Sequence, residues 1–138
     1  MGADKPLVLV VDDDEIDVVV VERALARLGD CIDIKSAGDG QEALDVLQAR
    51  DPLPPMTLVL LDLNMHRMNG FGFLESWQEA KNLSRVAVFV MTSSWRRQDM
   101  ERAYQFPIAG YVVKNENDEY AQSLAALVQG YVDLVRVL

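Results

Sequence analysis

Three short apolar runs, at residues 7–11, 58–61 and 86–91, constrain the fold of this chain more than any other feature. None of them alternates apolar with polar residues, so a strand formed by such a run has to be buried on both faces. Strands of this kind are typical of a parallel sheet that carries helices on both sides. Two weaker runs, at 31–35 and 109–113, are expected to form the outer strands of the same sheet.

Amphipathic segments follow these runs and predict five helices, at Asp14–Leu28, Gln41–Ala49, Gly70–Glu79, Trp95–Tyr104 and Asp118–Val137. Asp14 is expected to cap the first helix and Gly29 to end it. The expected buried stripe of that helix is Ile16, Val19, Val20, Ala24 and Leu28. The expected stripe of the last helix is Tyr120, Leu124, Leu127, Val128, Tyr131, Leu134 and Val135. The repeated order of strand and helix predicts an α/β fold with a five-stranded, doubly wound parallel sheet and five helices.

Length, charge and cysteine content exclude several classes of protein. The 138 residues suit one domain, residues 1–138, and the longest apolar run of six residues is far below the roughly 20 that a membrane helix needs. The 13 Lys and Arg against 22 Asp and Glu give a net charge of −9, which argues against a nucleic-acid partner. Cys31 is the only cysteine, so no internal disulfide can form and a cytoplasmic location is expected.

Polar residues stand at the ends of four of the five expected strands. They are Asp12, Asp13, Asp14, Asp62, Thr92, Ser93 and Lys114. The functional site of a doubly wound parallel sheet lies outside the carboxyl ends of its strands, so these side chains are expected at one rim. Carboxylates gathered at one edge repel one another, and a hard divalent cation with oxygen ligands would offset that repulsion. The set therefore indicates a functional site rather than scattered caps and solvated residues.

These residues lie in segments that resemble the receiver domain of two-component response regulators. The segments are Leu9–Asp14, Leu61–Met65, Met68–Gly70, Met91–Ser93 and Tyr111–Lys114. The resemblance extends over the whole chain. It implies the flavodoxin-like strand order 2-1-3-4-5 and a stand-alone, chemotaxis-regulator-like response regulator without an output domain.

The resemblance also implies how the acidic residues act. Asp62 would accept a phosphoryl group from a sensor histidine kinase or a phosphotransfer protein, and the domain would slowly remove that group again. Asp13 would bind Mg²⁺ (or Mn²⁺) directly, with Asp12 acting through water. Asp62 and the backbone carbonyl of Asn64 would complete the protein ligands. Few carboxylates and several waters suit Mg²⁺.

A second group of residues would bind the phosphoryl group and transmit its arrival. The resemblance implies that Thr92, with Ser93 beside it, and Lys114 contact the phosphoryl oxygens. Tyr111 matches the family's switch aromatic and would move with Thr92. The changed surface of the fourth helix, fifth strand and fifth helix would then bind a downstream protein target or a second copy of the chain.

Two positions depart from the family pattern, which usually has proline at each. They are His66, four residues after the expected phosphoacceptor, and Asn115, directly after the expected lysine. Loss of proline loosens the loop but removes no reacting group. His66 is the only histidine, so it could relay a phosphoryl group or sense pH, or it could be an ordinary loop residue.

Two other functions remain open on the sequence alone. Residues 12–16 approach the DxDx[TV] motif of haloacid-dehalogenase-like phosphohydrolases, with Asp12 as the nucleophile, although Ile16 breaks the pattern. The chain could also be a pseudo-receiver that docks partners without being phosphorylated. Turnover of a generic phosphate ester would identify the first alternative, and absence of phosphorylation would identify the second.

Overall fold

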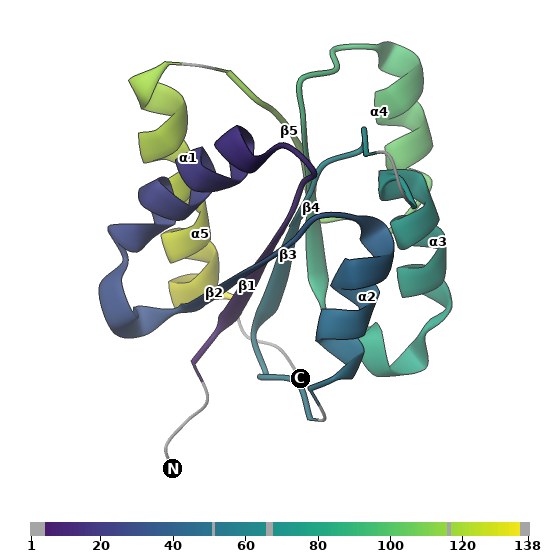
Figure 1. Ribbon diagram of the computed structural model, residues 1–138, viewed down its shortest axis with the longest axis horizontal. Helices are drawn as coiled ribbons and strands as arrows, with labels where there is room; N and C mark the ends of the chain where they lie inside the picture. The colour runs from purple at the N-terminus through teal and green to yellow at the C-terminus, as the bar shows by residue number, and fades with distance from the viewer. Residues whose placement is uncertain (1–4, 51, 66–67, 116, 136–138) are drawn as a thin grey trace.

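The computed structural model describes residues 5–50, 52–65, 68–115 and 117–135. Five strands form one sheet in the order β2-β1-β3-β4-β5, and every neighbouring pair is parallel (Figure 1). The strands are β1 (Leu7–Val11), β2 (Asp33–Ala37), β3 (Thr57–Leu61), β4 (Ala87–Thr92) and β5 (Gly110–Val113). This topology confirms the predicted α/β fold and its strand order.

The helices form two layers, one on each face of the sheet. They are α1 (Glu15–Ala26), α2 (Gly40–Gln48), α3 (Gly70–Glu79), α4 (Arg97–Ala103) and α5 (Asp118–Leu134). Helices α1 and α5 cover one face, and α2, α3 and α4 cover the other (Figure 1). Within the described ranges, no helix combines the length and the apolar character needed to cross a membrane.

The two layers explain why the central strands do not alternate apolar and polar residues. Successive side chains of a strand point to opposite faces of the sheet. In β1, Val8 and Val10 pack with α1 and α5, whereas Leu9 and Val11 pack with α2 and α3. All five residues of β1 and all five of β3 are buried. Burial on both faces, expected from the apolar runs, is confirmed for these strands.

Four of the five helices begin with a side-chain cap. Asp14, Asp39, Asn69 and Asn117 each accept a hydrogen bond from a backbone N–H in the first turn of the helix that follows. Such caps satisfy donors that the start of a helix leaves unpaired. Helix α4 differs, because Arg96 at its start makes no capping hydrogen bond.

The structure corrects some predicted boundaries. Strand β2 begins at Asp33 rather than at Cys31, which lies in a 3₁₀ turn, Gly29–Cys31. Helix α4 begins at Arg97, two residues after the predicted start at Trp95. Helix α1 ends at Ala26 rather than at Leu28, and α5 ends at Leu134, three residues before the predicted Val137, which itself lies outside the described residues. Helix ends often differ by one or two residues because terminal turns fray, and the corrections to α1 and α4 are of that size.

The predicted buried stripe of α1 is wrong at three positions. Ile16, Val19 and Val20 are exposed, by 75%, 42% and 42%. Val21 and Leu25 are buried there instead. The run of four valines surrounds much of the helix with apolar side chains, so helical spacing could not decide which side faces the sheet. In α5, Leu127 and Leu134 of the predicted stripe are likewise exposed.

Candidate functional site

Three carboxylates meet at the carboxyl ends of β1 and β3. Asp12 and Asp62 directly follow these neighbouring strands, and the Asp62 N–H donates to the Val11 carbonyl at 2.9 Å. Oxygens of Asp12, Asp13 and Asp62 all lie within 4.8 Å of one another. Asp12 and Asp62 are buried, whereas Asp13 is exposed. Oxygen donors in this arrangement fit a hard divalent cation such as Mg²⁺.

Lys114 places a positive charge at this rim. It follows β5, and its backbone N–H donates to the Thr92 carbonyl at 2.8 Å. Its Nζ lies 2.6 Å from an oxygen of Asp12 and 3.8 Å from an oxygen of Asp62. The side chain is only 14% exposed, so the ammonium neutralises part of the carboxylate charge inside the protein.

The surroundings of Asp62 and Lys114 shift both of their pKa values. Burial raises the pKa of Asp62 to about 6, and the Asp12 carboxylate also raises it, although Lys114 acts in the opposite direction. For Lys114, burial favours the neutral amine. The hydrogen bond to Asp12 and the charge of Asp62 nevertheless raise its pKa above the ordinary value. Lys114 is therefore charged at neutral pH, while ionised Asp62 is destabilised by its surroundings.

The pKa of Asp62 predicts how the metal-free protein responds to pH. A carboxyl with a raised pKa binds its proton more tightly in the folded state, so it stabilises the fold at acid pH. That stabilisation is lost as pH rises through about 6. We expect the free energy of unfolding to fall by about 1–2 kcal/mol from this group between pH 5 and pH 7.5. Urea titrations in EDTA would measure this fall, and Asp62→Asn should reduce it. An equal pH dependence in the variant would contradict the prediction.

Thr92 and Tyr111 are connected through the segment that follows β4. Thr92 is fully buried, and its Oγ1 accepts a hydrogen bond from the Ser94 N–H at 3.3 Å. The Tyr111 hydroxyl donates to the Ser94 carbonyl at 3.1 Å. Ser93, which lies between Thr92 and Ser94 in the sequence, is exposed. A displacement of the Thr92 hydroxyl would therefore act on the same residue that holds the tyrosine.

Close packing of Gly70 fixes the loop after Asp62. The Asn64 N–H donates to Asp62 Oδ1 at 3.3 Å, and the Gly70 N–H donates to the Leu63 carbonyl at 3.0 Å. A Cβ atom at Gly70 would lie 2.6 Å from the Leu63 Cα and 2.7 Å from the Asp62 carbonyl oxygen. Only glycine fits here without displacing the backbone of Asp62 and Leu63.

Gly70→Ala is therefore expected to destabilise the protein by about 1–3 kcal/mol, because the new methyl group meets backbone rather than a side chain that can move. Gly130→Ala is the matched control, since a Cβ atom there has nothing within 4 Å. That change lies inside α5, where alanine favours helix more than glycine does by about 1 kcal/mol. Urea unfolding of both variants measures the difference. Equal stabilities would show that the Asp62 loop adjusts freely.

Two residues at the rim were missed from the sequence. Asp17 lies in α1, and its carboxylate accepts a hydrogen bond from Lys114 Nζ at 3.1 Å. Ser94 is the residue whose backbone contacts both Thr92 and Tyr111. Its hydroxyl also donates to Asp99 at 2.6 Å. Asp17 follows Asp13 by four residues, so helical spacing could have placed it near the strand end. No comparable signal distinguishes Ser94 from an ordinary turn serine.

Of the two positions that depart from the family pattern, the structure describes Asn115 but not His66. Asn115 is exposed, and its side-chain oxygen accepts a hydrogen bond from the Asn117 N–H at 3.0 Å. This contact supports the turn before α5 and is one that proline could not make. His66 lies outside the described residues.

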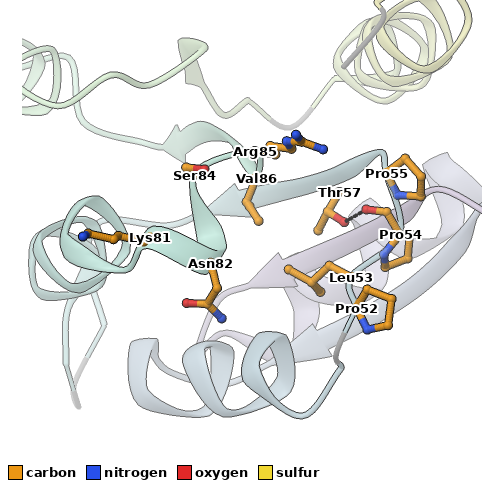
Figure 2. Close-up of a pocket in the computed structure, with 10 residues that line it drawn as sticks. All are labelled: Pro52, Leu53, Pro54, Pro55, Thr57, Lys81, Asn82, Ser84, Arg85 and Val86. Carbon is orange, nitrogen blue, oxygen red and sulfur yellow. Dashed lines mark hydrogen bonds between the residues drawn. The ribbon is translucent and has the colours of Figure 1, made fainter. Parts of the chain in front are cut away.

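A separate cavity lies at the opposite end of the sheet. It has a volume of about 470 Å³ and lies between the start of β3 and the segment before β4 (Figure 2). The lining residues are Pro52, Leu53, Pro54, Pro55, Thr57, Lys81, Asn82, Ser84, Arg85 and Val86. Leu53 and Val86 point into the hollow, whereas the Lys81 amine extends away from it (Figure 2). The carboxylates and Lys114 do not line this cavity. Asp12, Asp13, Asp62 and Lys114 thus gather at the other end of the sheet.

Comparison with known proteins is consistent with this geometry. The model of the response regulator receiver domain family matches residues 8–126. A probable chemotaxis protein CheY of Rhizobium etli is 34% identical over 103 residues, which cover 75% of this chain and 76% of the relative. Response regulator Rcp1 of Synechocystis sp. is 28% identical over 127 residues, covering 90% and 84% of the two chains.

Solved structures share the fold. The phosphorylated cyanobacterial phytochrome response regulator RcpA matches with a TM-score of 0.87 and 23% identity, over 97% of this chain and 99% of that one. The Mn²⁺-bound form of response regulator Rcp1 matches with a TM-score of 0.83 and 24% identity, over 96% and 99%. At these identities the matches establish the fold alone.

Proposed function

Because this chain belongs to the response regulator receiver family, we propose that it is a signalling phosphoacceptor that takes a phosphoryl group onto Asp62. Receiver domains of this family act in two-component systems and are not classical enzymes. The observation that supports the proposal most is the buried Asp62 carboxylate between the carboxylates of Asp12 and Asp13 and the Lys114 ammonium. The phosphodonor would be a sensor histidine kinase or a phosphotransfer protein.

In the proposed reaction, an oxygen of Asp62 attacks the phosphorus of a phosphohistidine. A bond between oxygen and phosphorus forms, the bond between phosphorus and nitrogen breaks, and the imidazole leaves with the electron pair. Lys114 neutralises the charge of the phosphoryl oxygens, which is the main means of catalysis in such transfers. Water later attacks the same phosphorus and restores the carboxylate, so the signal decays slowly.

A divalent cation is part of the proposal. Mg²⁺ or Mn²⁺ would be held by Asp12, Asp13, Asp62 and the backbone carbonyl of Asn64. Bound there, it supplies positive charge that offsets the carboxylates and the incoming phosphoryl group. The three carboxylates within 4.8 Å fit such an ion, and the related Rcp1 has been solved in a Mn²⁺-bound form.

We further propose that the phosphoryl group is read out on α4, β5 and α5. Thr92, assisted by Ser93, would donate its hydroxyl to a phosphoryl oxygen. The contact from Tyr111 to Ser94 then transmits the shift to the surface. Exposed large apolar side chains on and beside these elements are Trp95, Tyr104, Leu127 and Leu134. They suit a downstream protein target or a second copy of the chain.

The exposed apolar residues of α1 support a docking surface for the phosphodonor protein. Ile16 is 75% exposed and lies in the first turn of α1, close to the rim. Ile16→Glu is expected to slow phosphoryl transfer from a phosphotransfer protein about tenfold, because it places a charge in an apolar contact. Transfer from a small phosphodonor should not change. Leu134→Glu, in the last turn of α5, is the matched control. Equal slowing by both variants would contradict this surface.

The proposed function is tested by incubating the protein with a small phosphodonor, with and without Mg²⁺. Intact-mass measurement should show one added phosphate only with the metal, and hydroxylamine should remove it, as expected of an acyl phosphate. Peptide mapping should place the modification at Asp62. A protein that takes up no phosphate under these conditions would be a docking pseudo-receiver instead.

We propose that residues 1–138 act as one receiver domain and that it works in the cytoplasm. The acidic composition gives no support for nucleic acid as a partner. The chain would thus connect a protein phosphodonor to a protein target.

A further inference from the structure

Lys114 lies at unequal distances from the three carboxylates around its ammonium group. Its Nζ lies 2.6 Å from Asp12 and 3.1 Å from Asp17, both within hydrogen-bond distance, but 3.8 Å from Asp62. The ammonium therefore contacts the first two carboxylates and stands back from the third.

This spacing suits a phosphoryl group better than it suits the free carboxylate. A lysine hydrogen-bonded directly to Asp62 would hold the lone pair that must attack phosphorus, and Asp62 would be a weaker nucleophile. An ammonium that stands back leaves that oxygen free. It also lies where the oxygens of an incoming phosphoryl group extend beyond the carboxylate, so it can bind them without a large movement.

Asp17 is well placed to keep Lys114 in this position. The start of α1 is fixed by its cap, because the Ile16 N–H donates to Asp14 Oδ1 at 2.9 Å. Asp12 is shared, since its other oxygen accepts from the Asp14 N–H at 2.9 Å. The hydroxyl of Tyr120, which is buried nearby, makes no hydrogen bond within the described chain and does not compete.

We propose that Asp17 is a positioning residue that holds Lys114 back from Asp62 and keeps the nucleophilic oxygen available. Without Asp17, Lys114 keeps Asp12, and Asp62, at 3.8 Å, is the other carboxylate that it already faces. The inference rests on the proposed function, because it concerns the rate at which Asp62 takes up a phosphoryl group. It assigns a role to a side chain that the receiver motifs do not include.

The test compares Asp17→Ala with Glu15→Ala. Both remove one negative charge from the first turn of α1, and no contact joins Glu15 to Lys114. Loss of charge alone favours an anionic phosphodonor, so Glu15→Ala should be phosphorylated as fast as the wild type or faster. Asp17→Ala should be about fivefold slower at saturating phosphodonor and Mg²⁺, the size expected for a partly exposed ion pair. Asp17→Glu should recover most of the rate.

A crystal structure of Asp17→Ala gives a readout that does not depend on activity. Lys114 Nζ is expected within hydrogen-bond distance of Asp62. The inference is overturned if Asp17→Ala reacts as fast as Glu15→Ala, or if the ammonium remains near 3.8 Å from Asp62. A wild-type protein that takes up no phosphate would overturn the proposed function itself. If the wild type is phosphorylated and Asp17→Ala and Glu15→Ala react at equal rates, only the role of Asp17 is overturned.

Discussion

Asp62→Asn is expected to abolish phosphorylation by small phosphodonors and by a phosphotransfer protein alike. The amide nitrogen and oxygen are poor nucleophiles, and the variant loses one of the carboxylates proposed to hold the cation. The loss should exceed 100-fold, because the reacting atom itself is removed. Intact-mass measurement after incubation with Mg²⁺ and phosphodonor gives the answer directly.

Asp45→Asn is the control for this substitution. Asp45 lies in α2, is exposed and bonds only to Gln41 among the side-chain contacts of the described chain, so labelling should remain normal. Phosphate that persists in Asp62→Asn and maps to Asp12 would contradict the proposal. It would instead favour a haloacid-dehalogenase-like phosphohydrolase, with Asp12 as the nucleophile.

Lys114→Ala is expected to destabilise the metal-free protein by about 2–4 kcal/mol. The substitution removes the cation that pairs with the buried Asp12 and Asp62 in the described part of the chain, and breaking a buried ion pair from one side is costly. Urea unfolding in EDTA measures the loss. Mg²⁺ should restore part of it, because the ion supplies the missing positive charge and binds only the folded state.

Lys81→Ala is the control, since this exposed lysine lies at the opposite end of the sheet and should change stability by less than about 0.5 kcal/mol. The loss in Lys114→Ala should also shrink as the pH falls below about 6, where Asp62 takes up its proton and loses its charge. A Lys114→Ala protein as stable as Lys81→Ala would show that Asp12 and Asp62 are not strained by their proximity.

The sheet could be predicted because its signals are local. Unbroken apolar runs at residues 7–11 and 58–61 have only one stable environment, which is burial between two helical layers. The residues that follow those strands, Asp12 and Asp62, then have to lie at one rim, because parallel strands end at the same edge. The resemblance to receiver domains added the roles of individual residues, which remain proposals.

Other features depend on contacts that no local pattern specifies. The valines of α1 could present either side to the sheet, and packing against β1 and α5 decided which side is buried. Asp17 reaches Lys114 across 97 residues of sequence, so the pairing exists only in the folded chain. The start of β2 at Asp33 is set by its register with Leu7, which the sequence of β2 does not encode.

The missing cap of α4 has a consequence for the energy landscape of this domain. The first turn of α4 lacks the side-chain cap that the other four helices have, so it should cost less to unravel than their first turns. Its amides should exchange with solvent faster than those of α3, through local opening that leaves the sheet intact. A helix whose first turn opens at a low free-energy cost can also adopt a new arrangement at a low cost. The helix that begins without a side-chain cap is thus also one of the elements proposed to carry the signal.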